Sequence, residues 1–208
     1  MRRTTRKLAL VLVLLAVPLT AAAQDPVIPA DEFVYCTVCH GVQLMGNPIL
    51  KAPRLSGMET WYVERQLQAF KNGWRGNRDD DAVGSEMQPM AAALSDVQIV
   101  EVAEYVAATR SELPEQTVTG DAARGEMFYG TCAACHGAAG EGNEALGSPA
   151  LTGLNDWYLA TQIKNYRDGS RGSHEEDTRG RQMRTASQIL PDDAVIADVV
   201  AYVASLRP

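Results

Sequence analysis

The chain has few of the residues that build several common kinds of site. Its 208 residues include only four cysteines, three histidines and 6% aromatic residues. Beyond residue 17 no apolar run reaches the length of about 20 residues that a membrane-spanning helix needs. No stretch alternates apolar and polar residues as a half-buried strand does, so the sequence predicts an all-α fold. No pairing of a nucleophile with a base is evident either, which argues against an enzyme.

Residues 1–23 have the composition of a cleaved export signal. A basic head is followed by an apolar run over residues 8–17, a proline, and three alanines that end at Ala23. A signal peptidase recognises this order of segments. The apolar run is about half the length needed to span a bilayer as a helix. We therefore expect a soluble mature protein in the periplasm, with retention of the segment as a membrane anchor as the alternative.

The charge balance is acidic and becomes more so after export. The formal net charge is −7, and loss of the four basic residues in 1–23 makes it −11. An acidic protein is poorly suited to bind nucleic acid or an anionic membrane surface. It is better suited to electrostatically steered encounters with a basic patch on another protein.

Two copies of one unit follow each other along the chain. At an offset of 96 residues, many positions match in register, which chance does not explain. The segment 111–120 contains Pro114 and many polar residues, as a linker does. We therefore predict a first domain over 24–112, a linker over 113–119 and a second domain over 120–208. The matched positions include Pro53 with Pro149, Leu55 with Leu151, Trp61 with Trp157, Tyr62 with Tyr158, Gln66 with Gln162, Arg75 with Arg171 and Met87 with Met183.

Both halves show helical periodicity. Apolar residues recur at helical spacing over 59–71 and 156–167, and again from 96 to 107 and from 192 to 206. Ser95 and Asp192 stand where the last helix of each half should begin. We expect the Trp-Tyr pairs of the two halves to pack in helix-lined cores rather than to take part in redox chemistry.

All four cysteines lie in two Cys-x-x-Cys-His motifs. These are Cys36, Cys39 and His40 in the first half and Cys132, Cys135 and His136 in the second. This motif attaches haem c, because two cysteines three apart form thioethers to one porphyrin edge and the histidine lies under the iron. Two covalently bound haem c groups are therefore expected. Two disulfides or a thioredoxin-like pair would leave the adjoining histidines unexplained. A zinc site would need the two cysteine pairs closer together than the 92 residues that separate Cys39 from Cys132.

The second iron ligand follows by elimination. After His136 the second half offers only Met183 and His174, and the first half has four methionines but no further histidine. Only Met87 has a methionine partner under the repeat. Met87 and Met183 are therefore predicted to be the axial ligands, a role in which thioether sulfur pairs with histidine. Met90 remains as pocket packing or an alternative ligand, and His174 remains as a solvated loop residue or a substitute ligand.

The two motifs, the Pro-x-Leu-x-Gly that follows each, and the segments around Met87 and Met183 resemble tandem class I cytochromes c, particularly the dihaem cytochrome c4 group. The resemblance implies two small helical domains related by a pseudo-twofold axis. It also implies that the carbonyls of Pro53 and Pro149 orient the proximal histidines. The first half has Pro29 and Phe33 where the second has Gly125 and Tyr129, so its first helix should be short.

We therefore expect a periplasmic electron carrier rather than an enzyme, working by outer-sphere transfer through two His/Met-ligated haems. The expected partners are redox proteins: a quinol-oxidising complex or dehydrogenase as donor, and a terminal oxidase as acceptor. A tightly bound redox subunit of an oxidase or dehydrogenase complex is the alternative, because the long polar segments before Met87 and Met183 could be docking surfaces. A dihaem enzyme such as a peroxidase or thiosulfate dehydrogenase is a third hypothesis.

Overall fold

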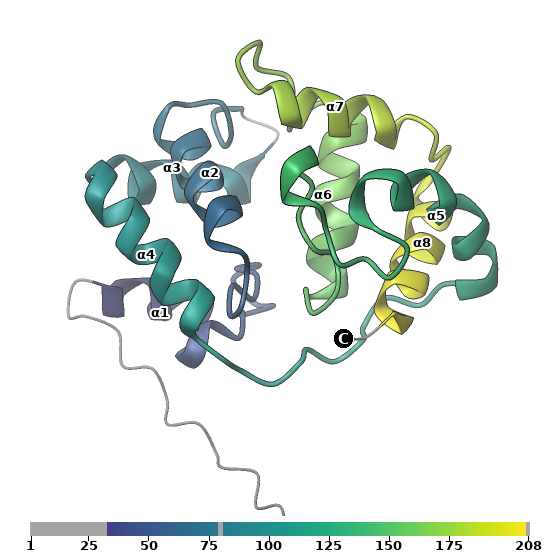
Figure 1. Cartoon of the computed structure of the whole chain (residues 1–208), viewed down its shortest axis with the longest axis horizontal. Helices are drawn as coiled ribbons and strands as arrows, with labels where there is room; N and C mark the ends of the chain where they lie inside the picture. The colour runs from purple at the N-terminus through teal and green to yellow at the C-terminus, as the bar shows by residue number, and fades with distance from the viewer. Residues whose placement is uncertain (1–32, 79–80, 207–208) are drawn as a thin grey trace, which may run out of the picture.

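The computed structural model describes residues 33–78 and 81–206, and the signal segment 1–23 and Pro29 lie outside them. Helices fall into two groups, one on each side of Figure 1, joined by an extended segment. No β-strand occurs in this described part of the chain, which confirms the all-α prediction. None of its helices has both the length and the apolar content to cross a membrane. The first group contains α1 (Val34–His40), η2 (Val42–Leu44), α2 (Thr60–Lys71), α3 (Ala82–Ala92) and α4 (Asp96–Ala108); the second contains α5 (Ala122–His136), η3 (Glu144–Leu146), α6 (Asp156–Asp168), α7 (Thr178–Ser187) and α8 (Asp193–Ser205).

Each group of helices buries its own hydrophobic core. In the first domain α2 and α4 pack together around residues such as Ile99 and Val106, each 1% exposed. In the second domain α5 and α6 pack on α8 around Ile196 and Val200, both fully buried. Burial of one such side chain contributes about 1.5–3 kcal/mol relative to exposure. The apolar periodicity over 96–107 and 192–206 therefore marks the central helix of each domain.

The helix that carries the Cys-x-x-Cys-His motif differs in length between the domains. Helix α1 spans seven residues and α5 spans fifteen. Phe33, just before α1, stacks on Tyr105 with ring centroids 6.3 Å apart. The matched pair Tyr129 and Tyr202 lies at 5.2 Å. The aromatic contact with the central helix is thus kept in both domains, and within the described residues the first helix is short, as the sequence predicts.

Two helices, α3 and α7, are not predicted by the residue pattern. Each begins at an aspartate that caps its first turn. The Asp81 carboxylate accepts a hydrogen bond from Gly84 N at 3.0 Å, and Asp177 accepts one from Gly180 N at 2.8 Å. Asp81 is only 7% exposed. These aspartates are therefore helix caps, which stabilise the helix N-terminus.

The segment between the domains is extended but fastened to the second domain. The Asp156 carboxylate accepts hydrogen bonds from Thr117 Oγ1 at 2.8 Å and from Val118 N at 2.7 Å. Gln116 Nε2 donates to Ala204 O at 2.8 Å. The connection therefore behaves as part of the second domain rather than as a free tether.

Candidate haem sites

The two cysteines and the histidine of each motif lie on one face of their helix. Positions three and four apart are neighbours on a helix surface. In the first domain Cys36 is half-buried, Cys39 is exposed and His40 is 5% exposed. In the second domain Cys132 is half-buried, Cys135 is exposed and His136 is 8% exposed. Each helix therefore presents two free thiols beside a buried imidazole.

Both buried imidazoles are held by a proline carbonyl. His40 Nδ1 lies 2.8 Å from Pro53 O, and His136 Nδ1 lies 2.8 Å from Pro149 O. A carbonyl oxygen only accepts hydrogen bonds, so Nδ1 carries the proton and Nε2 keeps a lone pair for a metal. Burial lowers the pKa of both histidines, partly offset by the bond to the proline carbonyl. The carbonyl contacts are those that the resemblance implies.

A glycine turn brings each proline back to its histidine. Gly41 and Gly137 follow the histidines with φ of 79° and 83°, a region that strongly favours glycine. Gly46 N then donates to His40 O at 2.7 Å, and Gly142 N donates to His136 O at 2.8 Å. The loop therefore closes on the motif helix in the same way in both domains.

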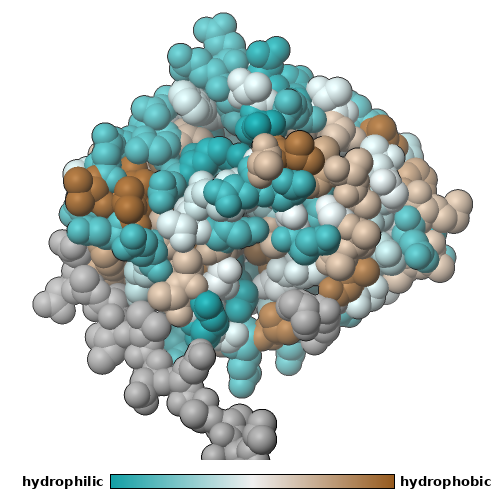
Figure 2. Space-filling model, in the orientation of Figure 1, coloured by the Kyte–Doolittle hydropathy of each residue, from teal (hydrophilic) through white to brown (hydrophobic). Residues whose placement is uncertain are grey.

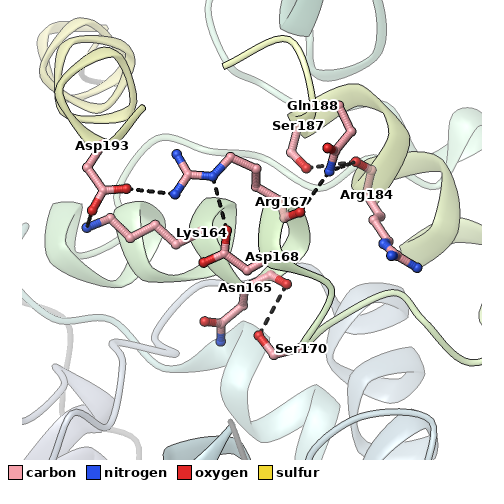
Figure 3. Close-up of polar contacts among 9 residues, drawn as sticks. All are labelled: Lys164, Asn165, Arg167, Asp168, Ser170, Arg184, Ser187, Gln188 and Asp193. Atoms are coloured by element: carbon pink, nitrogen blue, oxygen red, sulfur yellow. Dashed lines mark hydrogen bonds and ion pairs between the residues drawn. The ribbon is translucent and has the colours of Figure 1, made fainter. Parts of the chain in front are cut away.

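The two predicted methionine ligands occupy matched positions in α3 and α7. Both side chains are half-buried, and Met87 packs against the first hydrophobic core. Met90, one turn later, is 39% exposed. In the second domain Gln188 Nε2 donates to Arg167 O at 2.8 Å, which ties the end of α7 to α6 (Figure 3). The helix that carries Met183 is thereby fixed against its domain.

Two buried arginines join the domains. Arg75 and Arg171 are 7% and 3% exposed, and each lies over an aromatic ring of its own domain at 4.4 Å from the centroid. Each donates to a glutamine of both domains and to a tyrosine of the other domain. The contacts are Arg75 to Gln66 (2.9 Å), Gln162 (3.0 Å) and Tyr158 (3.1 Å), and Arg171 to Gln162 (2.7 Å), Gln66 (2.6 Å) and Tyr62 (3.3 Å).

This reciprocal pattern is that of a pseudo-twofold interface, in which each contact has a counterpart with the domains exchanged. It also corrects an expectation, because the hydroxyls of Tyr62 and Tyr158 each accept a hydrogen bond from the arginine of the other domain rather than lying in the core of their own. The repeat could have suggested this, since a buried arginine, glutamine and tyrosine recur together in both halves. Their partners, however, belong to the other half, which helical periodicity does not reveal.

His174 also lies at the interface rather than free in a loop. Its ring stacks on Trp74 of the first domain with centroids 6.1 Å apart. Trp74 Nε1 donates to Glu176 Oε2 at 3.0 Å. The structure therefore places His174 in a contact between domains, in a different segment from Met183.

With the fold and these sites described, comparison with known proteins becomes informative. The family model described as "Cytochrome c" matches residues 33–110 and 122–207. The chain belongs to the cytochrome c family. A thiosulfate dehydrogenase electron acceptor from Stutzerimonas stutzeri is 36% identical over 82% of this chain and 78% of its own length.

Solved structures agree with this family. Reduced cytochrome c4 from Pseudomonas stutzeri has a TM-score of 0.66 and 26% identity, covering 83% of this chain and 93% of that one. A thiosulfate dehydrogenase from Marichromatium purpuratum also has a TM-score of 0.66, with 27% identity, over 83% of this chain and 36% of that longer chain. The protein is thus a dihaem, cytochrome c4-like electron carrier rather than an enzyme, and its cofactors are two haem c groups, as predicted.

The side chains fit that cofactor. Each domain offers two thiols at the spacing of the attachment motif and a neutral imidazole with Nε2 available. Haem c also carries carboxylate groups, and the buried guanidiniums of Arg75 and Arg171 suit them chemically. Arg75 Nε is buried without a hydrogen-bond partner among the described residues. The hydrogen bonds that Arg75 and Arg171 donate to glutamine and tyrosine side chains all go to uncharged groups.

Proposed function

We propose that this chain is an exported periplasmic carrier with the predicted division into a signal peptide over 1–23, domains over 24–112 and 120–208, and a linker over 113–119. In the first domain Cys36 and Cys39 form the thioethers, and His40 and Met87 are the iron ligands. In the second domain Cys132 and Cys135 form the thioethers, and His136 and Met183 are the ligands. The paired 2.8 Å bonds from each histidine to its proline carbonyl carry this proposal.

Bound haem c supplies a one-electron couple at its iron. The residues of the chain hold and tune that centre. The proline carbonyls fix the tautomer and the orientation of both imidazoles, and a hydrogen bond from Nδ1 to a carbonyl raises the basicity of Nε2 as a ligand. A thioether as the second ligand raises the reduction potential relative to a second imidazole. With both axial positions filled, the site is suited to outer-sphere electron transfer.

We further propose a sulfur-oxidising dehydrogenase as the electron donor and a terminal oxidase as the acceptor. The relative that is 36% identical is named as the electron acceptor of thiosulfate dehydrogenase. The acidic balance, −7 for the whole chain, suits steering toward a basic patch. On the face seen in Figure 2, hydrophilic residues dominate and brown apolar residues form small separate groups. Such a face favours brief docking over a permanent apolar interface.

A redox titration of the mature holoprotein, followed by visible absorption, tests the ligation. We expect two low-spin haems, each showing the weak sulfur-to-iron charge-transfer band and a positive potential. A high-spin haem, or a haem without that band, would contradict the proposed ligation. Stopped-flow mixing with a reduced thiosulfate dehydrogenase tests the partner, and we expect fast reduction that slows as ionic strength rises.

A bound redox subunit is the second candidate function. The observation that favours it is the match to 36% of a longer thiosulfate dehydrogenase chain, in which a segment similar to this protein accompanies the rest of that chain. Size-exclusion chromatography of the native protein from its source distinguishes the two. A stable stoichiometric complex supports the subunit, and a free protein that exchanges between donors supports the carrier.

A further inference from the structure

Each domain reaches across the interface to the peptide that holds the other domain's histidine. Glu59 Oε1 of the first domain accepts a hydrogen bond from Ala150 N of the second at 2.8 Å. Asn155 Oδ1 of the second domain accepts one from Arg54 N of the first at 2.6 Å. Glu59 and Asn155 occupy matched positions at the 96-residue offset. The two bonds therefore form a reciprocal pair across the pseudo-twofold axis.

The peptide groups involved are those whose carbonyls bind the histidines. The N–H of Ala150 and the carbonyl of Pro149 belong to one peptide unit, and that carbonyl lies 2.8 Å from His136 Nδ1. A hydrogen-bonded chain thus runs from Glu59 through one peptide group to the imidazole. Linked hydrogen bonds polarise one another, so an acceptor on the N–H side makes the carbonyl a stronger acceptor from the histidine.

The same chain exists in the first domain with a different end group. It runs from Asn155 through the peptide of Arg54 and Pro53 to His40 Nδ1, the last step also at 2.8 Å. The backbone is shaped to admit it, because a Cβ on Gly46 would lie 2.7 Å from Arg54 N and 2.9 Å from Asn155 Oδ1. The hydrogen-bonded series that leads to His40 therefore ends in the neutral amide of Asn155, and the series that leads to His136 ends in the carboxylate of Glu59.

This difference in charge matters at an iron centre. A carboxylate polarises the peptide more strongly than an amide does, because charge-assisted hydrogen bonds are about twice as strong as neutral ones. It also places a negative charge near His136.

We propose that Glu59, in the first domain, is a positioning residue that lowers the reduction potential of the second haem, while Asn155 leaves the potential of the first haem without such a shift. A negative charge and a more basic imidazole both stabilise the oxidised iron. Glu59 therefore shifts a single electron shared by the two haems toward the first, with no proton transferred. This inference rests on the proposed ligation by His40 and His136.

Redox titration of three variants of the holoprotein tests the inference. Glu59→Gln keeps an acceptor oxygen for Ala150 N but removes the charge. We expect it to raise one of the two potentials, changing the equilibrium constant for reduction of that haem about three- to tenfold, the scale of one charge acting through a partly solvated region. Asn155→Asp adds the charge at the matched position and should lower the other potential.

Glu101→Gln is the matched control, because Glu101 is exposed on α4 in the same domain and removal of its charge should shift neither potential appreciably. The second haem is identified in a Met183→His background, which marks its spectrum. An unchanged pair of potentials in Glu59→Gln, or a shift confined to the first haem, would overturn the inference. Because Asn155 is buried, Asp at this position could prevent folding, and Glu59→Gln then decides alone.

The failure of the proposed function looks different from the failure of this inference. If the unmodified protein lacks two low-spin haems with the sulfur-to-iron band, the proposed ligation is wrong. If it has both bands and Glu59→Gln moves neither potential, only the role of Glu59 is wrong.

Discussion

The two domains share one repeat but are stabilised differently. The second begins with a fifteen-residue helix that packs along α8, where buried Asp198 pairs with Arg124. In the first domain the motif helix α1 has only seven residues, and the core lies mainly between α2 and α4. Duplication has therefore preserved the histidine, proline and methionine positions, while the surroundings that tune and support them have diverged.

The largest expected effect is a change of axial ligand, which compares the two irons directly. Met183→His should remove the sulfur-to-iron band from one haem and lower its potential by on the order of 0.1–0.2 V, within the roughly 0.8 V range that axial ligands set. Met87→His should do the same to the other haem. Spectroelectrochemistry measures both quantities.

Met90→Leu is the control for this pair of variants. Met90 is 39% exposed and aligns with Ala186 rather than with a methionine. Both bands should persist in this variant. If Met90→Leu lost a sulfur-to-iron band and Met87→His kept both, Met90 rather than Met87 would be the ligand of the first iron.

The next largest effect is expected for the interface arginines. Their variants test whether the two arginines related by the pseudo-twofold axis contribute equally to the free energy of unfolding. Arg171→Leu leaves the Tyr62 hydroxyl without its arginine donor and leaves Gln66 and Gln162 with Arg75 as their remaining donor, so we expect a loss of about 2–4 kcal/mol in the free energy of unfolding of the holoprotein. Arg75→Leu should lose a similar amount, and urea denaturation measures both.

The double variant sharpens this comparison. Gln66 and Gln162 each accept from both arginines, so removal of one arginine leaves each glutamine oxygen a donor, whereas removal of both leaves none. The combined loss should therefore be larger than the sum of the single losses. Strict additivity would show that the two arginines act independently.

The sequence predicts one part of this molecule well and another poorly, for a physical reason. The motif residues and the central helices near 96–107 and 192–206 follow from local spacing, since covalent attachment and helix packing need residues at fixed short separations. The capping box at Ser95 is equally local, and the structure contains it. These features needed no knowledge of distant contacts.

The features that distinguish the domains depend on residues about 100 positions apart. Trp74 meets His174, and Glu59 meets the peptide that orients His136. No periodicity signals such pairs. The residue pattern does not reveal α3 and α7, because α3 contains Gly84 and Pro89 and α7 is mostly polar, so neither shows a clear apolar periodicity.

A smaller effect is expected where the connecting segment is fastened, a contact that the first domain lacks because Thr60 stands opposite Asp156 in the repeat. Asp156→Asn should cost about 1–3 kcal/mol, because fewer acceptors remain for Thr117 and Val118. Thermal unfolding measures this, and Asp168→Asn, whose side chain is 62% exposed, should change little.

The pH dependence of that contact has a definite sign. Burial alone would raise the pKa of Asp156, but its hydrogen bonds from Val118 and Thr117 outweigh burial and hold the pKa below its usual range. A carboxyl whose pKa is lowered by folding stabilises the protein above its unfolded pKa and loses that contribution as pH falls through its folded pKa. The difference between the unmodified protein and Asp156→Asn should therefore shrink below about pH 4.

The smallest effect is expected for the surface ion pairs at the start of the central helix of each domain. Lys71 Nζ lies 2.9 Å from Asp96 in the first domain, whereas Asp193 in the second meets both Lys164 and Arg167 at 2.7 Å (Figure 3). Hydrogen bonds from these cations lower the pKa of both aspartates. Because the carboxylates face solvent, salt screens both pairs, and each contributes little.

Because Asp193 has two cationic partners and Asp96 has one, the loss of Asp193 should cost more stability. Asp193→Asn should lower the melting temperature more than Asp96→Asn at low ionic strength, and the difference should disappear in high salt. A difference that persists in high salt would mean that the aspartates differ as helix N-terminal residues rather than as ion-pair partners. That result would place the divergence of the two domains in the local geometry of α4 and α8 instead of in their surface charges.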